Sequence, residues 1–351
     1  MHSDPSPESP TGQAPEPVPA PGLPGAPGVP GGHSLQVAVS DTLKRGTPGR
    51  VPFSVEFMPP RDDAAEARLW SAAEAFHDLG ASFVSVTYGA GGSSRQRTER
   101  VAGKLARKPL TTLLHMTLVG HTGEEIRAIL REFASLGLTN LLALRGDPPG
   151  DPLGEWQGIE GGLVHAIDLI RLIRSLPECA DFDIGIASFP EGHYRAASLE
   201  DDTRHTVEKL RAGASYSITQ MFFNVEHYLR LRDRLAAFDP VDGAKPVIPG
   251  LMPITSLRSV RRQVELSGCE LPREMEDLFT RVAAGDERKN AAAIRKVGIE
   301  VTTRMAERLI AEGAPDLHFM TMNNVRATQE VLHNLGMAPA YGPGLGQDAV
   351  R

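Results

Sequence analysis

The chain has 351 residues, of which 41% are hydrophobic and 23% charged, and its formal net charge is −7. This composition is typical of a soluble globular protein with one large domain or two small ones. The negative charge and the lack of a basic block argue against a nucleic-acid binder. No apolar run is long enough to span a bilayer, and the N-terminus lacks a signal-peptide pattern. Two cysteines outside any CxxC pair indicate a reducing, cytoplasmic compartment.

The two ends of the chain differ in composition from the middle. Residues 1–45 are rich in Pro, Gly and Ala, and such a segment buries too little apolar surface to offset chain entropy, so we expect a disordered tail. Residues 338–351 are rich in Gly and Pro, and we expect a flexible C-terminal tail. Residues 46–337 are then the folded domain.

Within this domain, segments with strand periodicity alternate with segments with helical periodicity. The predicted strands are 53–57, 82–87, 111–117, 139–145, 183–188, 216–220, 246–251 and 317–321. The predicted helices are 64–79, 94–107, 122–136, 163–175, 199–212, 225–238, 257–266, 272–284, 286–312 and 326–335. This α/β alternation over roughly 290 residues fits a (β/α)8 TIM barrel, typically about 250 residues, with extra helices before the last strand. The alternative, a doubly wound open sheet, usually has a Gly-rich turn where this chain has Pro59 and Pro60.

The first predicted strand carries a carboxylate at its end. In FSVEFMPP, residues 53–60, hydrophobic residues alternate with Ser54 and Glu56, so these two side chains share the other face. Pro59 and Pro60 end the strand because proline has no N–H to donate. A buried carboxylate costs free energy unless it is paired or used in chemistry. Glu56 is therefore either a salt-bridged structural residue or a functional group.

In a barrel of this kind, functional groups lie at the carboxyl ends of the strands. Polar or ionisable residues occupy nearly all of these ends: Glu56, Thr87, Tyr88, His115, Arg145, Asp147, residues 188–193, Gln220 and residues 321–324. Each has a structural interpretation of its own, such as a turn hydrogen bond, a core histidine or an Arg–Asp pair. The Gly-rich segment 89–95 is either a flexible loop or a backbone anion site. Taken together, the ring of polar strand ends favours a ligand-binding site.

The sequence lacks the motifs of several catalytic classes. It has no Gly-x-Ser-x-Gly elbow, no HExxH and no Walker loop, and His115, His193 and His205 are not at zinc-ligand spacing, so we expect no metal site. Few nucleophiles, many hydrogen-bonding groups and one isolated carboxylate suit an enzyme that holds a polar cofactor and supplies one general acid.

Five motifs, in order, resemble the methylenetetrahydrofolate reductase family: FSVEFMPP at 53–60, FVSVTYGA at 83–90, LRGDPP at 144–149, PEGH at 190–193 and TQMFFN at 219–224. The resemblance implies a flavoprotein barrel with bound FAD, expected to form a homo-oligomer. NADH or NADPH would reduce the flavin and leave. Then 5,10-methylenetetrahydrofolate would bind in the same place and be reduced to 5-methyltetrahydrofolate, which supplies methyl groups for methionine synthesis.

The resemblance also implies roles for individual residues. Glu56 would be the general acid that protonates the folate nitrogen whose C–N bond opens, a role that needs a carboxyl pKa raised by burial. Asp147 would tune the charge near the flavin ring and the pterin. Gln220 would bind both nicotinamide and pterin, since an amide donates and accepts. The implied FAD-binding residues are Thr87, Tyr88, His115, Arg145, Gly146, Asp147, Phe189, His193, Asp202, His205 and Lys209.

The last predicted strand departs from the family pattern. The family usually has His-Phe-Tyr-Thr-Leu-Asn-Arg, whereas this chain has Met320 in place of the tyrosine and Asn324 in place of the arginine. These changes leave two alternatives to a nicotinamide-dependent reductase. One is an FAD- or folate-binding barrel without turnover, acting as a partner or regulatory subunit. The other is a reductase that uses a non-nicotinamide electron donor.

Overall fold

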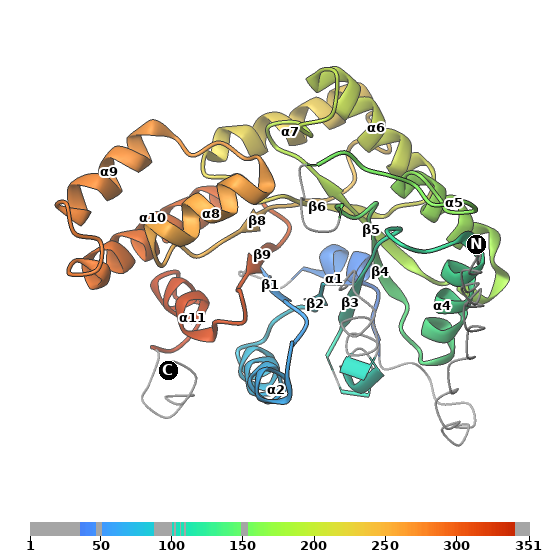
Figure 1. Ribbon diagram of the computed structural model, residues 1–351, viewed down its shortest axis with the longest axis horizontal. Coiled ribbons are helices and arrows are strands. Elements are labelled where there is room, and N and C mark those ends of the chain that lie inside the picture. Colours follow the sequence, from blue (N-terminus) through green and yellow to red (C-terminus); the bar gives the residue numbers. More distant parts are fainter. Residues whose placement is uncertain are drawn as a thin grey trace, which may run out of the picture. The chain divides into compact units, whose positions relative to one another are not determined.

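The structure, a computed structural model, describes residues 36–46, 51–87, 100–148 without 102, 106 and 109, and 154–340. Helices surround one parallel sheet (Figure 1) whose strand order is β7-β6-β5-β4-β3-β2-β1-β9-β8. The strands are β1 (Phe53–Phe57), β2 (Val84–Val86), β3 (Thr112–Met116), β4 (Asn140–Ala143), β5 (Asp183–Ser188), β6 (Tyr216–Thr219), β7 (Val247–Ile248), β8 (Gly250–Leu251) and β9 (Leu317–Met320). The prediction of a TIM-type barrel is confirmed, and the open doubly wound sheet is wrong.

The seventh predicted strand, residues 246–251, is broken in the middle. β7 pairs with β6 and β8 pairs with β9, while Pro249 separates them because it has no N–H for the ladder. The Gly250 N–H donates instead to Thr219 Oγ1 at 2.9 Å. A Cβ at Gly250 would lie 2.3 Å from the Thr219 carbonyl oxygen, so this close approach requires glycine. One broken strand thus pairs on both sides.

The helices follow the predicted alternation, with two differences at their starts. They are α1 (Val39–Arg45), α2 (Asp63–Asp78), α4 (Gly123–Ser135), α5 (Ala166–Ser175), α6 (Leu199–Arg211), α7 (Val225–Phe238), α8 (Leu257–Ser267), α9 (Arg273–Ala283), α10 (Ala291–Ala311) and α11 (Val325–Asn334). α5 begins later than residue 163, and α10 later than residue 286, where the Asp286 side chain accepts from the Arg288 and Lys289 N–H groups in a turn. The predicted helix over 94–107 lies largely outside the described residues.

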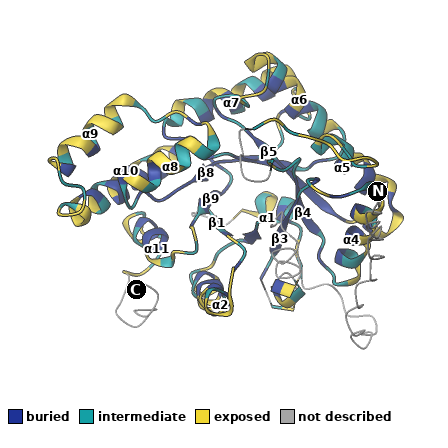
Figure 2. Ribbon diagram, in the orientation of Figure 1, coloured by how far each residue is buried: buried dark blue, intermediate teal, exposed yellow. Residues whose placement is uncertain are grey.

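The inside of the barrel is apolar on one side and polar on the other. Leu113, Leu142, Tyr216, Ile218 and Ile248 pack together on the side of β3, β4, β6 and β7. The inward positions of β1, β2 and β9 carry instead the buried side chains of Ser54, Ser85 and His318. Figure 2 shows that burial is concentrated on the strands and the inner faces of the helices. Glu56 is the next residue of β1 on the same face as Ser54, so it continues this polar side toward the carboxyl end of the strand.

The predicted disordered tail, residues 1–45, includes residues that are folded in the structure. Residues 39–45 form helix α1, and Val39 is fully buried against the apolar side of the barrel interior. The Val39 N–H donates to Asn140 Oδ1 at 3.0 Å, and the Ser40 N–H donates to Asp183 Oδ2 at 2.7 Å. Because Asn140 and Asp183 begin β4 and β5, α1 caps the amino end of the barrel. The tail prediction is thus wrong for residues 36–45, and residues 1–35 lie outside the described part.

Replacing Asn140 with Ala is expected to lower the free energy of unfolding by about 2 kcal/mol, because the buried Val39 N–H loses its acceptor and the Val37 carbonyl its donor. Urea unfolding measures the loss. Ser40→Ala is the control, since Ser40 makes its contact with Asp183 through the backbone and should stay within about 0.5 kcal/mol of wild type. Equal stability of both variants would mean that α1 contributes little.

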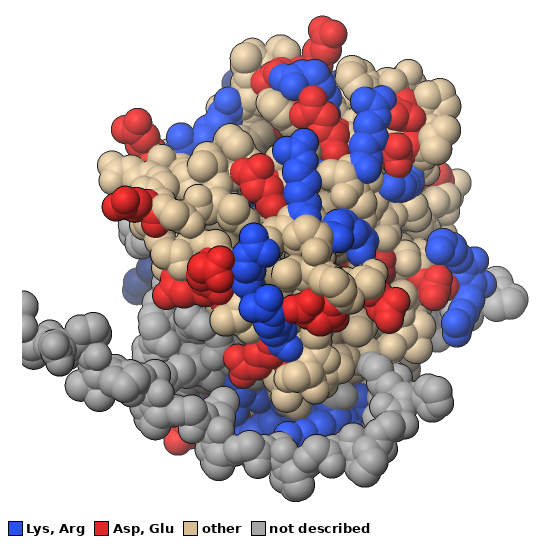
Figure 3. All heavy atoms as spheres, turned by 90° about the vertical axis from the view of Figure 1, so that its right-hand side faces the viewer, with Lys and Arg blue, Asp and Glu red and all other residues tan. Residues whose placement is uncertain are grey.

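Acidic and basic side chains lie interspersed on the face that Figure 3 shows. Ion pairs such as Arg131–Glu178 and Arg204–Glu208 connect neighbouring positions on the helices. Exposed pairs of this kind contribute little to stability. Among the described residues, no helix is both long and apolar enough to cross a bilayer.

Candidate active site

Glu56 is the last inward residue of β1, and it lies opposite Ser85 of β2 and Met320 of β9. Its outward neighbour Phe57 packs on Phe76 of α2, with ring centroids 6.0 Å apart, so the alternation of the strand turns Glu56 inward. The Glu56 side chain is 18% exposed. It is therefore largely enclosed by protein yet still reachable from the carboxyl end of the barrel.

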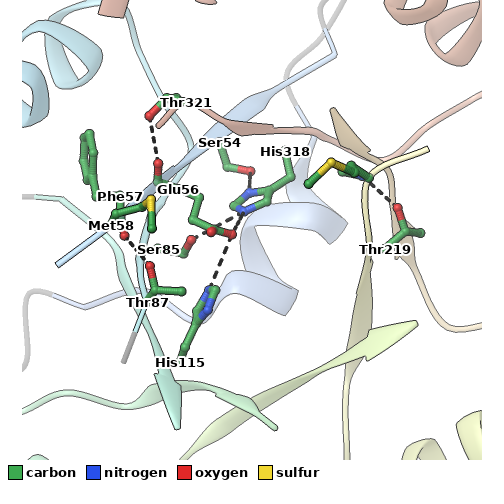
Figure 4. A network of polar contacts seen from close by, with 12 residues as sticks. Ser54, Glu56, Phe57, Met58, Ser85, Thr87, His115, Thr219, His318 and Thr321 are labelled. Atoms are coloured by element: carbon green, nitrogen blue, oxygen red, sulfur yellow. Dashed lines mark hydrogen bonds and ion pairs between the residues drawn. The ribbon is translucent and has the colours of Figure 1, made fainter. Parts of the chain in front are cut away.

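Two histidines face the Glu56 carboxylate (Figure 4). His318 Nε2 lies 3.6 Å and His115 Nε2 lies 3.9 Å from Glu56 Oε2. Both distances exceed that of a hydrogen bond, so a small side-chain movement separates these contacts from bonding. Both rings are buried. His115, which was predicted to bind FAD, also faces Glu56.

The expected rise in the pKa of Glu56 is not found in the structure. Burial raises the pKa of this carboxyl, but the polar contact with His318 and the positive charge of either histidine lower it, and the net shift is downward. The expectation considered burial alone. It missed the histidines because they come from β3 and β9, and only the register of the strands brings them to Glu56. Burial also lowers the pKa of His115, which favours its neutral form.

His318 belongs to a buried polar chain that was not predicted from the sequence. Ser54 Oγ lies 2.8 Å from His318 Nδ1 and donates to Asp316 Oδ1 at 2.6 Å. Ser82 Oγ donates to Asp316 Oδ2 at 2.6 Å, and Ser85 Oγ lies 3.4 Å from His318 Nε2. One signal in the sequence could have found this chain. Ser54 precedes Glu56 by two residues and Asp316 precedes His318 by two, the spacing of side chains on one strand face.

Three polar side chains hold the backbone on either side of Glu56. Thr87 Oγ1 donates to the Phe57 carbonyl at 2.8 Å, and Thr321 Oγ1 donates to the Glu56 carbonyl at 2.8 Å. The Asn323 amide accepts from the Met58 N–H at 2.9 Å and donates to the Met58 carbonyl at 3.1 Å. Thr87, predicted to bind FAD, thus also has a structural contact. These bonds fix the strand end that carries the carboxylate.

Asn323 makes its two bonds from a left-handed backbone conformation, with φ of 59°. Asn323→Ala is expected to lower the free energy of unfolding by about 2 kcal/mol, because it removes both bonds and places a less tolerant residue at positive φ. Asn323→Gly removes the same bonds without the conformational penalty, so it should recover about 1 kcal/mol of that loss. Urea unfolding of both variants separates the two causes. An Ala variant as stable as wild type would contradict the assignment.

A second group of predicted residues gathers where β5 runs into α6. The rings of Phe189 and His193 meet edge to face, with centroids 4.6 Å apart. Lys209 is directed at the end of β5, where its Nζ donates to the Ala187 carbonyl at 3.2 Å, and burial lowers its pKa to about 8. Asp202 is buried, and its Oδ2 has no hydrogen-bond partner among the described residues.

Arginines connect this group with the end of β4. Burial and then the charges of Arg145, Lys209 and Arg195 lower the pKa of His193 to about 4, so cations surround the ring. The Arg145 guanidinium lies 5.8 Å from the centre of the Trp156 ring. Asp147 is exposed, yet desolvation raises its pKa against the charges of Arg145 and Arg195. The loops after β4 and β5 thus form one electropositive region.

Gly146, between these charged residues, must be glycine in this conformation. Its φ is 87°, and a Cβ would lie 2.8 Å from a Val119 methyl and 2.9 Å from Thr117 Cβ. The backbone of the loop after β4 therefore passes directly over the end of β3. Any side chain at residue 146 would push Arg145 and Asp147 out of place.

Gln220 follows β6 and borders a narrow cavity of about 20 Å³, together with Phe189, Gly192 and Cys269. Its Oε1 accepts from the Met221 N–H at 2.9 Å. Gln220 and Phe189, both predicted from the sequence, therefore lie on the same side of the site. The structure does not connect this side to Glu56 through any hydrogen bond between the described residues.

The remaining predicted positions lie less centrally. His205 is mostly exposed on α6, between Asp201 and Glu208, rather than among the buried groups. Tyr88 lies outside the described residues. Asn324 caps α11 by accepting from the Ala327 N–H, and Met320 packs against the apolar cluster of α8, α9 and α10. Among the described residues, no three His, Cys, Asp or Glu side chains come together as a metal site requires.

The sequence model of the family described as "Methylenetetrahydrofolate reductase" matches residues 42–336. The chain belongs to the methylenetetrahydrofolate reductase family. It is thus an oxidoreductase, and the family resemblance expected from five motifs is confirmed.

Several relatives in the methylenetetrahydrofolate reductase family are similar over most of this chain. It is 35% identical over 295 residues to the 5,10-methylenetetrahydrofolate reductase of Escherichia coli K12, covering 83% of this chain and 93% of that protein. It is 30% identical to the Zea mays protein named methylenetetrahydrofolate reductase (NADH) 1, covering 85% of this chain and 50% of that one. A Clostridium thermocellum protein described as binding two copies of 5-methyl-5,6,7,8-tetrahydrofolic acid shares the fold, with TM-score 0.53, 16% identity, and coverage of 81% and 92%.

Proposed function

We propose that this protein reduces 5,10-methylenetetrahydrofolate to 5-methyltetrahydrofolate, with FAD as bound cofactor and NADH or NADPH as electron donor. The observation that carries the proposal is the position of Glu56. In a chain of this family, it is a nearly enclosed carboxylate at the carboxyl end of β1, backed by two histidines.

The residues at the ends of β4 and β5 fit FAD. Arg145, Arg195 and Lys209 give the region positive charge, which suits a diphosphate. The Oδ2 of buried Asp202 has no hydrogen-bond partner in the described part of the chain, and it suits a hydroxyl donor such as a ribose. The residues proposed to hold the cofactor are Thr87, Tyr88, His115, Arg145, Gly146, Asp147, Phe189, His193, Asp202, His205 and Lys209. When bound, FAD supplies two-electron chemistry between the nicotinamide and the folate.

Glu56 has the role of proton donor to the folate nitrogen whose C–N bond opens. A planar ligand over the barrel end would remove water from the exposed 18% of this side chain. Loss of that water disfavours the carboxylate and raises its pKa, against the lowering caused by the two histidines. We propose that Gln220 forms hydrogen bonds with the ligand through its amide. Asp147 places a negative charge beside the pterin.

The proposal is tested by following the flavin spectrum under anaerobic conditions after reconstitution with FAD. We expect bleaching by NADH or NADPH, and recovery of the oxidised spectrum on addition of 5,10-methylenetetrahydrofolate. A protein that binds FAD but reacts with neither substrate would instead be a binding barrel without turnover.

Two departures from the family pattern near the end of the last strand call for one further measurement, with a different electron donor. Met320 and Asn324 replace the usual aromatic and arginine of the family pattern. If both nicotinamides fail while dithionite-reduced protein still converts the folate, the donor is of another class.

A further inference from the structure

A continuous polar chain runs through the barrel interior from its amino end to Glu56. It consists of Asp316, Ser54 and His318, all fully buried, and it ends at Glu56 Oε2. Figure 4 shows the part of the chain from Ser54 through His318 to Glu56. Ser54 Oγ lies 2.6 Å from Asp316 Oδ1 and 2.8 Å from His318 Nδ1, and His318 Nε2 lies 3.6 Å from Glu56 Oε2. The other side of the interior is filled with Leu, Ile and Tyr side chains, so these polar groups stand where apolar side chains would cost less.

The hydrogen bonds fix which ring nitrogen of His318 carries the proton. Ser54 has a single hydroxyl proton and donates it to Asp316 Oδ1, so its oxygen is left to accept. The neighbour of that oxygen is His318 Nδ1 at 2.8 Å, which therefore carries a hydrogen. In the neutral ring Nε2 is then the free base, and Nε2 is the atom that faces Glu56.

We propose that Ser54 and Asp316 hold His318 as the Nδ1–H tautomer, so that His318 Nε2 stores the proton that Glu56 delivers to the folate. This inference rests on the proposed function for its last step only. His318 is a positioning residue, because it acts through Glu56.

With the site closed, the Nε2–H bond of the His318 imidazolium breaks and an O–H bond forms on Glu56 Oε2. That O–H bond then breaks as its proton passes to the folate nitrogen, and Glu56 is left as the carboxylate. The imidazole is left neutral with its Nδ1–H on Ser54. After the product leaves, Glu56 takes up one proton from water through its exposed edge and shares it with Nε2 again.

The charged and titratable groups that face His318 are Glu56 from β1, His115 from β3 and Asp316 before β9. Two residues without a titratable side chain also contact His318: Ser85 of β2, and Phe83 just before β2, whose ring centroid lies 5.5 Å from that of His318. His115 is a poorer store, because its Nε2 lies farther from Glu56 Oε2, at 3.9 Å, and has no hydrogen-bond partner among the described residues.

The tautomer can be tested without cofactor or substrate. Nitrogen-15 NMR of the histidine rings at pH 7.5, with His318 assigned by its loss in His318→Gln, should show Nδ1–H in wild type. Ser54→Ala should convert His318 to the Nε2–H form, whereas Ser217→Ala, a buried strand serine on the other side of the barrel, should not. An Nε2–H tautomer in the wild type would overturn the proposal.

The storage role is tested by the pH dependence of the folate half-reaction. His318→Gln should slow it by about 10- to 100-fold, within the range of acid–base catalysis, and leave flavin reduction by the donor unchanged. Its alkaline limb should move to lower pH, because the variant has lost His318 Nε2, the second site that holds the proton when Glu56 is ionised. If His318 only lowered the pKa of Glu56, the limb would move to higher pH, and the proposal would be wrong. Failure of wild type to reduce folate would refute the proposed function, while the tautomer result would still stand.

Discussion

Glu56→Gln is expected to slow the folate half-reaction by about 10²- to 10⁴-fold, because the amide keeps the shape of the side chain but gives up no proton. Flavin reduction by the donor should remain within about two-fold, since that half-reaction needs no acid at this position. Anaerobic stopped-flow spectroscopy measures the two half-reactions separately.

A matched control for this substitution lies outside the site. Glu330 of α11 is also partly buried and pairs with Arg295 and Arg326, so Glu330→Gln removes a similar carboxylate from a helix outside the barrel interior. It should leave both half-reactions unchanged. Equal losses in both half-reactions of Glu56→Gln would show that Glu56 serves the structure and not the chemistry.

Asp316→Asn is expected to remove the pH dependence that the buried Asp316 carboxyl gives to the free energy of unfolding. Burial raises the pKa of Asp316 from 3.8 to about 6, against hydrogen bonds from Ser54 and Ser82. A raised pKa means that the folded state binds the Asp316 proton more tightly than the unfolded state does, so this protonation stabilises the fold. The stabilisation is present below pH 4 and is lost by about pH 7. The difference of roughly two pKa units corresponds to about 3 kcal/mol.

Urea unfolding at pH 4 and pH 7.5 measures this effect. The stability of Asp316→Asn relative to wild type should rise by up to about 3 kcal/mol between these pH values, because Asn cannot ionise. Comparing the two chains cancels the titration of all other groups. A constant difference across this range would mean that the Asp316 carboxyl titrates normally despite its burial.

The sequence predicted the barrel and its strand ends because hydrophobic periodicity and strand-ending prolines are local signals. It placed Glu56 at an inward strand end on that basis. It missed the influence of His318 and His115 on that carboxyl, since three strands far apart in the chain must pair in register before those rings meet it. Asn323 was missed for a similar reason, because its bonds to Met58 depend on a left-handed turn and a partner 265 residues away.

The start of the fold was missed for a different reason. Residues 36–45 follow a long Pro- and Gly-rich stretch and are short, so composition alone favours disorder. What orders them is a few contacts with Asn140 and Asp183, which no local pattern reveals.

Helix α1 also has a consequence for the order in which the chain folds. Its partners lie 101 and 143 residues further along the chain, so α1 leaves the ribosome long before Asn140 and Asp183 exist as docking points. Contacts this distant in sequence form slowly, because a large loop must close first. We expect α1 to dock late, after β4 and β5 have paired, and pulsed hydrogen exchange should show the Val39 amide protected after those of β4. The first helix of the fold would then be among the last parts to become native.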